Sequence, residues 1–177
     1  TSLELWAYDI PVCVHTKLSP DLLMRLGRDG VIDGVKDSSG DDVAFRWLCR
    51  ANEAAGHPLQ LLTGHEVVVD GAYMSGADGS VPGLANVDPE GYVRQWQAYE
   101  RRDWEAVRTE QDRLADLMRI VQVKGVAGFG AGVGAFKAAL HLLGVFDSPE
   151  MPRPVAALEG DNVEHVASVL RAVDLLS

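Results

Sequence analysis

Short apolar runs separated by turn residues recur along the first part of the chain. Four of them, at residues 3–10, 31–35, 59–63 and 79–84, predict buried β-strands. The first run ends at Pro11, which has no backbone N–H to donate to a strand ladder. Between the runs, apolar residues such as Val43 and Trp47 recur at helical spacing. The pattern therefore predicts strands that alternate with helices.

Several of these helices have clear starting signals. Ser19-Pro20 and Asp88-Pro89 each place a capping residue before a proline, which suits the first helical position. Gly40-Asp41-Asp42 opens another helix, and residues 66–74 predict a short one. Strand–helix units repeated without hairpin signals indicate parallel strands with crossover helices.

The pattern changes beyond residue 101. Residues 104–121, 134–143 and 162–176 predict three helices, and no further strand is indicated. We therefore expect an α/β part at residues 1–101 and a helical extension of the same domain at 102–177. A complete parallel barrel needs about eight strand–helix units in roughly 250 residues, about twice what is seen here. An open doubly wound sheet uses the same pattern, so periodicity alone does not choose between the two folds.

Composition narrows the class of protein. The 177 residues are 47% hydrophobic, which is enough for a globular core. The net charge of -10 argues against nucleic acid or an anionic membrane as a partner. The two cysteines, Cys13 and Cys49, have no metal or redox spacing and indicate free thiols in a reducing compartment. With no apolar run of membrane-spanning length and no signal peptide, we expect a cytoplasmic protein. Because Thr1 leads straight into a predicted strand, the chain is expected to be processed or part of a larger polypeptide.

Lys36 is the main candidate for chemistry. It follows the predicted strand 31–35 and precedes the small residues Ser38, Ser39 and Gly40. Ligands bind at the carboxyl ends of strands in α/β folds. An amine attacks a carbonyl only when it is deprotonated, and burial favours that neutral form. Position alone leaves two interpretations open: an imine-forming lysine, or an ordinary surface lysine in a turn.

The surrounding sequence favours the first interpretation. The run Gly34–Asp41 (Gly-Val-Lys-Asp-Ser-Ser-Gly-Asp) resembles the active-lysine signature of the dihydrodipicolinate synthase/N-acetylneuraminate lyase superfamily. Upstream, Tyr8-Asp9-Ile10-Pro11 is similar to that family's Tyr-Asn-[Val/Ile]-Pro at the end of barrel strand five. Further similar segments follow in the family's order at residues 62–64, 76–81, 85–87 and 134–140. The resemblance extends over nearly the whole chain, from about residue 3 to residue 176.

The resemblance implies a specific fold and mechanism. Members are (β/α)₈ barrels with a C-terminal helical extension, usually homotetramers, and they need no metal or organic cofactor. The chain is thus expected to be the C-terminal half of such a TIM barrel, about strands 5–8, plus the extension. By position, Lys36 would form an imine with pyruvate or another 2-keto acid. Gly64 would line the pocket, and Val81 would place a backbone carbonyl near the pyruvyl group.

Two departures bear on the substrate. In dihydrodipicolinate synthases an Arg two residues after the motif's Pro binds the aldehyde substrate's carboxylate; here that position is Cys13. A thiol cannot supply a bidentate guanidinium, so dihydrodipicolinate synthesis is disfavoured. Sialic acid lyases use acidic residues just after the strand-seven Gly to bind sugar hydroxyls, and the residues here are His65 and Glu66. These positions favour a 2-keto-3-deoxy sugar acid.

A third departure concerns proton transfer. The family's acid/base tyrosine and its carboxylate-binding Thr-Thr or Ser-Thr pair are assigned to strands that precede Tyr8. We therefore expect the catalytic partners of Lys36 to lie outside these 177 residues, and Tyr8 is not assigned that role.

Other signals are discounted. The histidines lack metal-ligand spacing, so no metal site is expected. The glycines of residues 130–135 loosely match a dinucleotide-binding pattern, but a helix rather than a strand precedes them. The four tryptophans are interpreted as core or subunit interface, and they lie at positions 6, 47, 96 and 104.

Three functional hypotheses remain. The first is a class I, pyruvate-dependent aldolase or lyase that uses Lys36 as its imine former. A keto-deoxy sugar acid dehydratase of the same superfamily shares the imine step. A non-catalytic half-barrel that only binds a ligand is the third.

Overall fold

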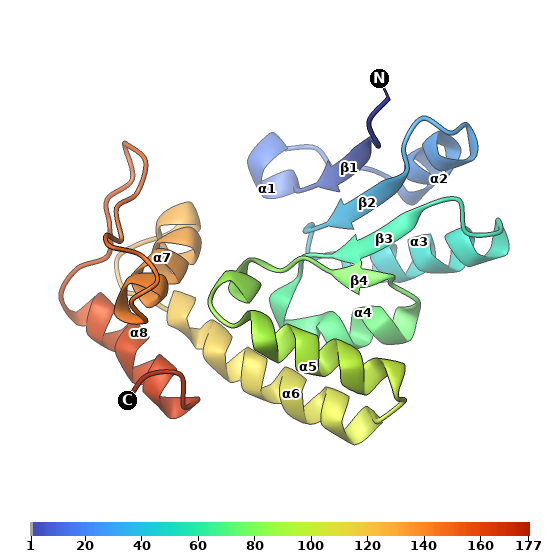
Figure 1. Ribbon diagram of the computed structural model, residues 1–177. Helices are drawn as coiled ribbons and strands as arrows, with labels where there is room; N and C mark the ends of the chain where they lie inside the picture. Colours follow the sequence, from blue (N-terminus) through green and yellow to red (C-terminus); the bar gives the residue numbers. More distant parts are fainter. Residues whose placement is uncertain (1) are drawn as a thin grey trace. The chain divides into compact units, whose positions relative to one another are not determined.

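The computed structural model describes residues 2–177 (Figure 1), and these form two compact units that meet between Pro82 and Gly83 in the sequence. Each unit is described by itself. The predicted domain bounds of 1–101 and 102–177 stay a prediction.

The first unit is built on a parallel four-stranded sheet in the order β1-β2-β3-β4. The strands are β1 (Trp6–Asp9), β2 (Gly34–Asp37), β3 (Gln60–Thr63) and β4 (Gly79–Ser80). The helices are α1 (Pro11–Val14), α2 (Pro20–Arg28), α3 (Asp42–Ala54) and α4 (Val69–Ser75), with the 3₁₀ turn η1 (Glu66–Val68) before α4. In Figure 1, α2, α3 and α4 follow one another along the sheet, and α3 packs against both neighbours. The predicted α/β class with parallel crossover units is confirmed.

The two faces of this sheet differ sharply. Val35 and Leu61 are fully buried on the face that the helices cover. Side chains alternate along a strand, so the neighbouring residues Tyr8, Lys36 and Leu62 lie on the opposite face. Tyr8 is 49% exposed there. The helix-covered face therefore supplies the core, and the opposite face, called the open face below, leaves polar side chains such as Tyr8 accessible.

The strands are shorter than predicted, and β1, β2 and β3 begin later than predicted. The run 31–35 was expected to be a strand, but Val31 N donates to Leu26 O (2.9 Å) in the turn that ends α2, with Gly30 at a φ of 64°. The strand β2 thus begins at Gly34 and includes Lys36. The run 79–84 yields only β4, because Pro82 has no N–H to continue the ladder and a 3₁₀ turn follows. At the first strand, pairing with β2 begins at Trp6 and ends at Asp9.

The predicted helix starts are confirmed. Ser19 Oγ accepts from Leu22 N at 3.3 Å, and an Asp41 carboxylate oxygen accepts from Ala44 N at 2.9 Å. Buried Asn52 then joins α3 to the chain entering β3, since its amide bonds both Leu59 O (2.8 Å) and Leu59 N (3.0 Å). This side chain satisfies two backbone groups that would otherwise be unpaired inside the protein.

The second unit is helical. Its elements are η2 (Gly83–Asn86), α5 (Pro89–Glu100), α6 (Trp104–Leu117), η3 (Met118–Val121), η4 (Gly128–Gly130), α7 (Gly132–Leu142) and α8 (Asp161–Ala172). The predicted helix 104–121 tightens to 3₁₀ geometry after Leu117, and the predicted helix 162–176 ends at Ala172, before Asp174 adopts a φ of 58°. Leu114, Leu117, Ile120 and Leu170 are fully buried and form its core.

Ion pairs tie α5 to α6. Asp88 caps α5 by accepting from Gly91 N (3.0 Å) and pairs with Arg113 of α6. Glu110 binds Arg94 (2.9 Å) and Arg113 (2.6 Å). The hydrogen bond to Glu110 raises the pKa of Arg94.

Three tryptophans are too exposed for the core. Trp6, Trp47 and Trp104 are 37%, 67% and 49% exposed, so their interpretation as core residues is wrong. Trp47 lies on the outer side of α3, because Phe45, Leu48 and Cys49 supply that helix's buried face. An interface role for these side chains stays a prediction.

Candidate functional site

The carboxyl ends of β1 to β4 lie at one edge of the sheet, because all four strands run in the same direction (Figure 1). The predicted site residues follow or end these strands. Lys36 lies in β2, Gly64 and His65 follow β3, Val81 follows β4, and Cys13 lies in α1 after β1. The topology thus gathers the predicted residues at one edge of the first unit.

Tyr8 and Lys36 are direct neighbours on the open face. They are register partners of β1 and β2, and Lys36 Nζ donates to the Tyr8 hydroxyl at 3.2 Å. The same nitrogen lies 4.3 Å from the centroid of the Tyr8 ring. The resemblance implies catalytic partners of Lys36 outside the chain and no role for Tyr8, whereas the structure brings the Tyr8 hydroxyl to the Lys36 amine.

A side chain at position 64 would crowd the Lys36 side chain. A Cβ atom at this position would lie 2.9 Å from Lys36 Cε and would also collide with Ser38 Oγ. Gly64 N donates to Asp37 O at 2.7 Å, which holds the backbone close to the end of β2. The absence of a side chain therefore gives the Lys36 side chain its room.

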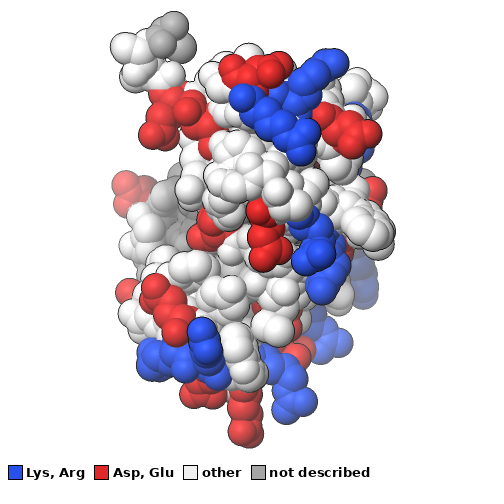
Figure 2. Space-filling model, turned by 90° about the vertical axis from the view of Figure 1, so that its right-hand side faces the viewer, with Lys and Arg blue, Asp and Glu red and all other residues white. Residues whose placement is uncertain are grey.

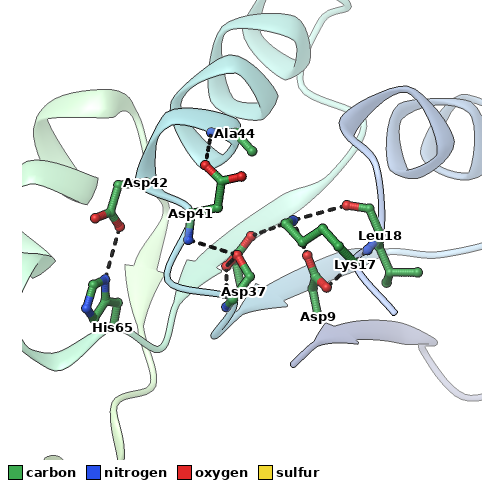
Figure 3. A network of polar contacts seen from close by, with 9 residues as sticks. Asp9, Lys17, Leu18, Asp37, Asp41, Asp42, Ala44 and His65 are labelled. Atoms are coloured by element: carbon green, nitrogen blue, oxygen red, sulfur yellow. Dashed lines mark hydrogen bonds and ion pairs between the residues drawn. The ribbon is translucent and has the colours of Figure 1, made fainter. Parts of the chain in front are cut away.

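His65 is turned toward the helix layer. Its Nδ1 lies 3.1 Å from a carboxylate oxygen of Asp42 in the first turn of α3 (Figure 3). Its backbone N donates to Thr63 Oγ1 at 3.2 Å. Glu66 is half-buried and begins the 3₁₀ turn η1. The pair His65–Glu66 thus stands at the carboxyl end of β3, with the imidazole held by Asp42.

Val81 and Cys13 occupy exposed positions. Val81 is 47% exposed, and its N–H continues the ladder by donating to Thr63 O at 2.7 Å. Cys13 is exposed in α1. Substrate-binding roles for these two residues, as for Gly64, His65 and Glu66, stay predictions.

The other cysteine is structural. Cys49 is a buried free thiol in α3, and burial together with the Asp78 carboxylate raises the pKa of the Cys49 thiol to about 12. Among residues 2–177, no three His, Cys, Asp or Glu side chains are grouped so as to hold a metal ion.

The face of the molecule drawn in Figure 2 is mixed in charge rather than basic. On the face drawn in Figure 2, acidic and basic side chains of the described residues are interspersed. No helix within residues 2–177 is both long enough and apolar enough to cross a membrane.

The chain is similar in sequence to known proteins over nearly its whole length. The Dihydrodipicolinate synthetase family matches residues 1–173. An uncharacterized DapA-like lyase of Halobacterium salinarum is 31% identical over 173 residues, which are 97% of this chain and 53% of that protein. A 4-hydroxy-tetrahydrodipicolinate synthase of Methanosphaerula palustris is 25% identical over 94% of this chain and 54% of that enzyme. The chain therefore spans about half the length of the curated relatives it matches.

Solved structures agree on the fold. A dihydrodipicolinate synthase from Bacteroides thetaiotaomicron matches with a TM-score of 0.86 and 27% identity, over 97% of this chain and 56% of that one. YagE, an Escherichia coli K12 prophage protein of the dihydrodipicolinic acid synthase family solved with pyruvate, matches with a TM-score of 0.89 and 20% identity, over 99% of this chain and 57% of that one. The parallel sheet and its helices are therefore consistent with half of a TIM barrel.

Proposed function

Because the chain belongs to the dihydrodipicolinate synthetase family, we propose that it carries the imine-forming residues of a class I, Schiff-base lyase that acts on pyruvate. The contact of 3.2 Å between Lys36 Nζ and the Tyr8 hydroxyl supports this proposal most directly. A nucleophilic amine beside a proton-transferring hydroxyl, at the carboxyl end of parallel strands, is what imine chemistry needs.

The reaction begins at the Lys36 amine. The neutral amine attacks the keto carbon of pyruvate, and the resulting carbinolamine loses water to give a protonated imine. That cation accepts electron density when the C3 methyl group loses a proton, which yields an enamine. The enamine adds to an aldehyde to form a carbon–carbon bond, and hydrolysis then frees Lys36. Cleavage of a 2-keto acid follows the same steps in reverse.

Tyr8 serves as the proton-transfer group in this proposal. Carbinolamine collapse requires a proton to reach the departing hydroxyl, and the Tyr8 hydroxyl already lies within hydrogen-bond reach of the amine. In this proposal Tyr8 thus supplies the acid/base function that the resemblance assigns to a tyrosine on an earlier strand.

The substrate class is inferred from residues at the same edge of the sheet as Tyr8 and Lys36. Cys13 stands where the resemblance expects a carboxylate-binding Arg, and a thiol cannot make that bidentate contact. Glu66 and His65 at the end of β3 can accept or donate hydrogen bonds to hydroxyl groups. We therefore favour a 2-keto-3-deoxy sugar acid over aspartate semialdehyde.

The test is to trap the imine. Incubation of the native polypeptide with pyruvate and borohydride should add a pyruvyl-derived mass to Lys36, as read by peptide mass spectrometry. Lys36→Arg should abolish the adduct, whereas Lys124→Met, at an exposed position of the second unit, should leave it unchanged. An adduct on another lysine, or none, would contradict the proposal.

A dehydratase of keto-deoxy sugar acids would give the same trapped adduct. Product analysis separates the two activities, because an aldolase releases pyruvate and an aldehyde whereas a dehydratase releases water and a longer keto acid.

A further inference from the structure

A second cluster lies directly behind the Tyr8–Lys36 pair. Asp9 and Asp37 are 1% and 5% exposed, and both carboxylates pair with the ammonium group of Lys17 (Figure 3). Lys17 contacts an Asp9 carboxylate oxygen directly and lies 3.6 Å from Asp37 Oδ2. All the ion pairs described for these two buried carboxylates end on this one lysine.

The strand register explains why the two carboxylates need a cation. Asp9 and Asp37 are Cα partners on β1 and β2, so their side chains emerge side by side on the helix-covered face. Like charges at paired positions repel, and little water reaches them here to screen that repulsion. Lys17 balances the repulsion and holds the ends of the two strands together.

The cluster also attaches a loop. Lys17 Nζ donates to Leu18 O at 3.1 Å, and Leu18 N donates to the second Asp9 carboxylate oxygen at 3.2 Å. The segment 10–18, which carries Cys13, is thereby fastened to the end of β1. On the other side, Asp37 accepts from Ser39 N (2.8 Å) and Ser39 Oγ (2.7 Å), which orders the turn after β2.

The reactive pair lies one residue before each carboxylate. Tyr8 precedes Asp9 in β1 and Lys36 precedes Asp37 in β2, on the opposite face of the same strand ends. A separation of the strand ends at Asp9 and Asp37 would therefore also move the Tyr8 hydroxyl away from the Lys36 amine. The family motif quoted above has a neutral Asn where this chain has Asp9.

We propose that Lys17 is a positioning residue: by holding the paired carboxylates Asp9 and Asp37 together, it fixes the distance between Tyr8 and Lys36. The inference rests on the proposed function, because it concerns the same reactive pair. If Lys17 acts by offsetting the repulsion between Asp9 and Asp37, then neutralising Asp9 should make the positive charge of Lys17 unnecessary.

The experiment uses four variants of the native polypeptide: Lys17→Met, Asp9→Asn, the double variant, and Lys124→Met as the control at an exposed lysine. Two rates are measured at Lys36 by mass spectrometry. One is trapping with saturating pyruvate and borohydride. The other is reductive methylation by formaldehyde, normalised to Lys137, which requires no pyruvate chemistry. Thermal unfolding of each variant shows which of them are folded.

Lys17→Met should slow trapping at least threefold and change the methylation rate of Lys36 by a similar factor. The double variant Asp9→Asn/Lys17→Met should restore both rates to within twofold of the native values. A merely structural ion pair would lower the unfolding temperature of Lys17→Met but leave both rates of the folded protein unchanged, and that result would overturn the inference. A double variant no better than Lys17→Met would do the same.

The two proposals fail in different ways. If the native polypeptide forms no pyruvate adduct but methylation of Lys36 follows the expected variant pattern, the proposed function is wrong and the positioning role stands. If the native polypeptide forms the adduct but Lys17→Met changes neither rate, the proposed function stands and the positioning role of Lys17 is wrong.

Discussion

The hydroxyl group of Tyr8 is the residue-scale feature that most affects the proposed chemistry. We expect Tyr8→Phe to form the borohydride-trapped adduct slowly, and to lower turnover by roughly a hundred- to ten-thousand-fold, the usual contribution of a positioned acid or base. The ring and its contact with the Lys36 ammonium remain in this variant, so the fold should be unaffected. Single-turnover kinetics with pyruvate measure the effect.

A matched control tests whether the Tyr8 effect is local. Tyr99→Phe removes a hydroxyl from a tyrosine of the second unit and should leave turnover unchanged. Equal turnover in Tyr8→Phe and the native protein would exclude Tyr8 as the proton-transfer group.

The two cysteines should differ in reactivity. At pH 8, iodoacetamide should alkylate the exposed Cys13, whereas Cys49 should stay unmodified because burial raises the pKa of its thiol to about 12. The raised pKa of Cys49 also affects stability. Above pH 9.0, the ordinary pKa of a thiol, the folded protein keeps the Cys49 proton while the unfolded chain loses it. The stabilisation from the neutral Cys49 thiol is therefore lost progressively as pH rises from about 9 toward 12. Alkylation of Cys49 at pH 8 in the folded protein, read by mass spectrometry, would contradict this.

Part of the candidate site could be predicted from residue types in the sequence, and part of it could not. Lys36 and Gly64 stand out in the sequence because a lysine and a glycine in those contexts carry recognisable signatures. Tyr8 has no role in the sequence analysis because the resemblance assigns the acid/base tyrosine to an earlier strand. Its contact with Lys36, 28 residues away, depends on a strand register that the sequence does not show. Once a parallel pairing of residues 6–9 with 34–37 is assumed, the alternation of side chains places Tyr8 opposite Lys36. Lys17 gave no signal, because it lies in a loop.

At the scale of elements, Gly64 lies where the end of β3 approaches the end of β2, with Gly64 N donating to Asp37 O at 2.7 Å. Gly64→Ala should slow trapping of pyruvate by roughly tenfold to a hundredfold, since a misplacement of about 1 Å in a reacting group costs on that order. The added methyl group would overlap Ser38 Oγ and lie 2.9 Å from Lys36 Cε, so the Ser38 or Lys36 side chain or the local backbone must move. The rate of adduct formation at Lys36 measures the effect.

Gly71→Ala is the matched control for Gly64→Ala. Gly71 lies within α4, and a Cβ atom there would meet nothing within 4 Å. This substitution should leave trapping unchanged and stabilise the protein by about 0.5–1 kcal/mol, the helix preference for Ala over Gly. Equal trapping rates in the two variants would show that the space beside Lys36 is not needed.

Element boundaries were the less predictable part of the fold. The number, order and parallel direction of the strands follow from the alternation of apolar runs and helix caps, but their ends depend on contacts between distant residues. Val31 and Ile32 are apolar enough for a strand, yet the backbone of Val31 bonds Leu26 in the turn that ends α2. Conversely, Lys36 and Asp37 are polar and still belong to β2, because pairing with β1 and β3 extends the ladder to them.

At the scale of the whole molecule, the sheet of the first unit has two outer strands, β1 and β4, each paired on one side only among the described residues. Unpaired strand edges promote self-association. We expect a polypeptide of only these 177 residues to associate in solution, and a polypeptide that supplies further strands to suppress this. Light scattering after size-exclusion chromatography measures both. A monodisperse 19.1 kDa species would contradict the expectation and would favour a half-barrel that functions alone. The homotetramer implied by the resemblance stays a prediction.

Because side chains alternate between the two faces of the sheet, an error in strand register during folding would have a specific consequence. Because side chains repeat every second residue, sliding β1 or β2 by one position would turn its carboxylate toward the open face and its reactive group toward the helices. Such a slipped chain would bury an amine or a phenol without a partner and would leave Lys17 without one of its carboxylates. The same shift would dismantle the reactive pair. Misassembled copies would thus be both unstable and inert, so the protein would not accumulate a folded form with misplaced reactivity.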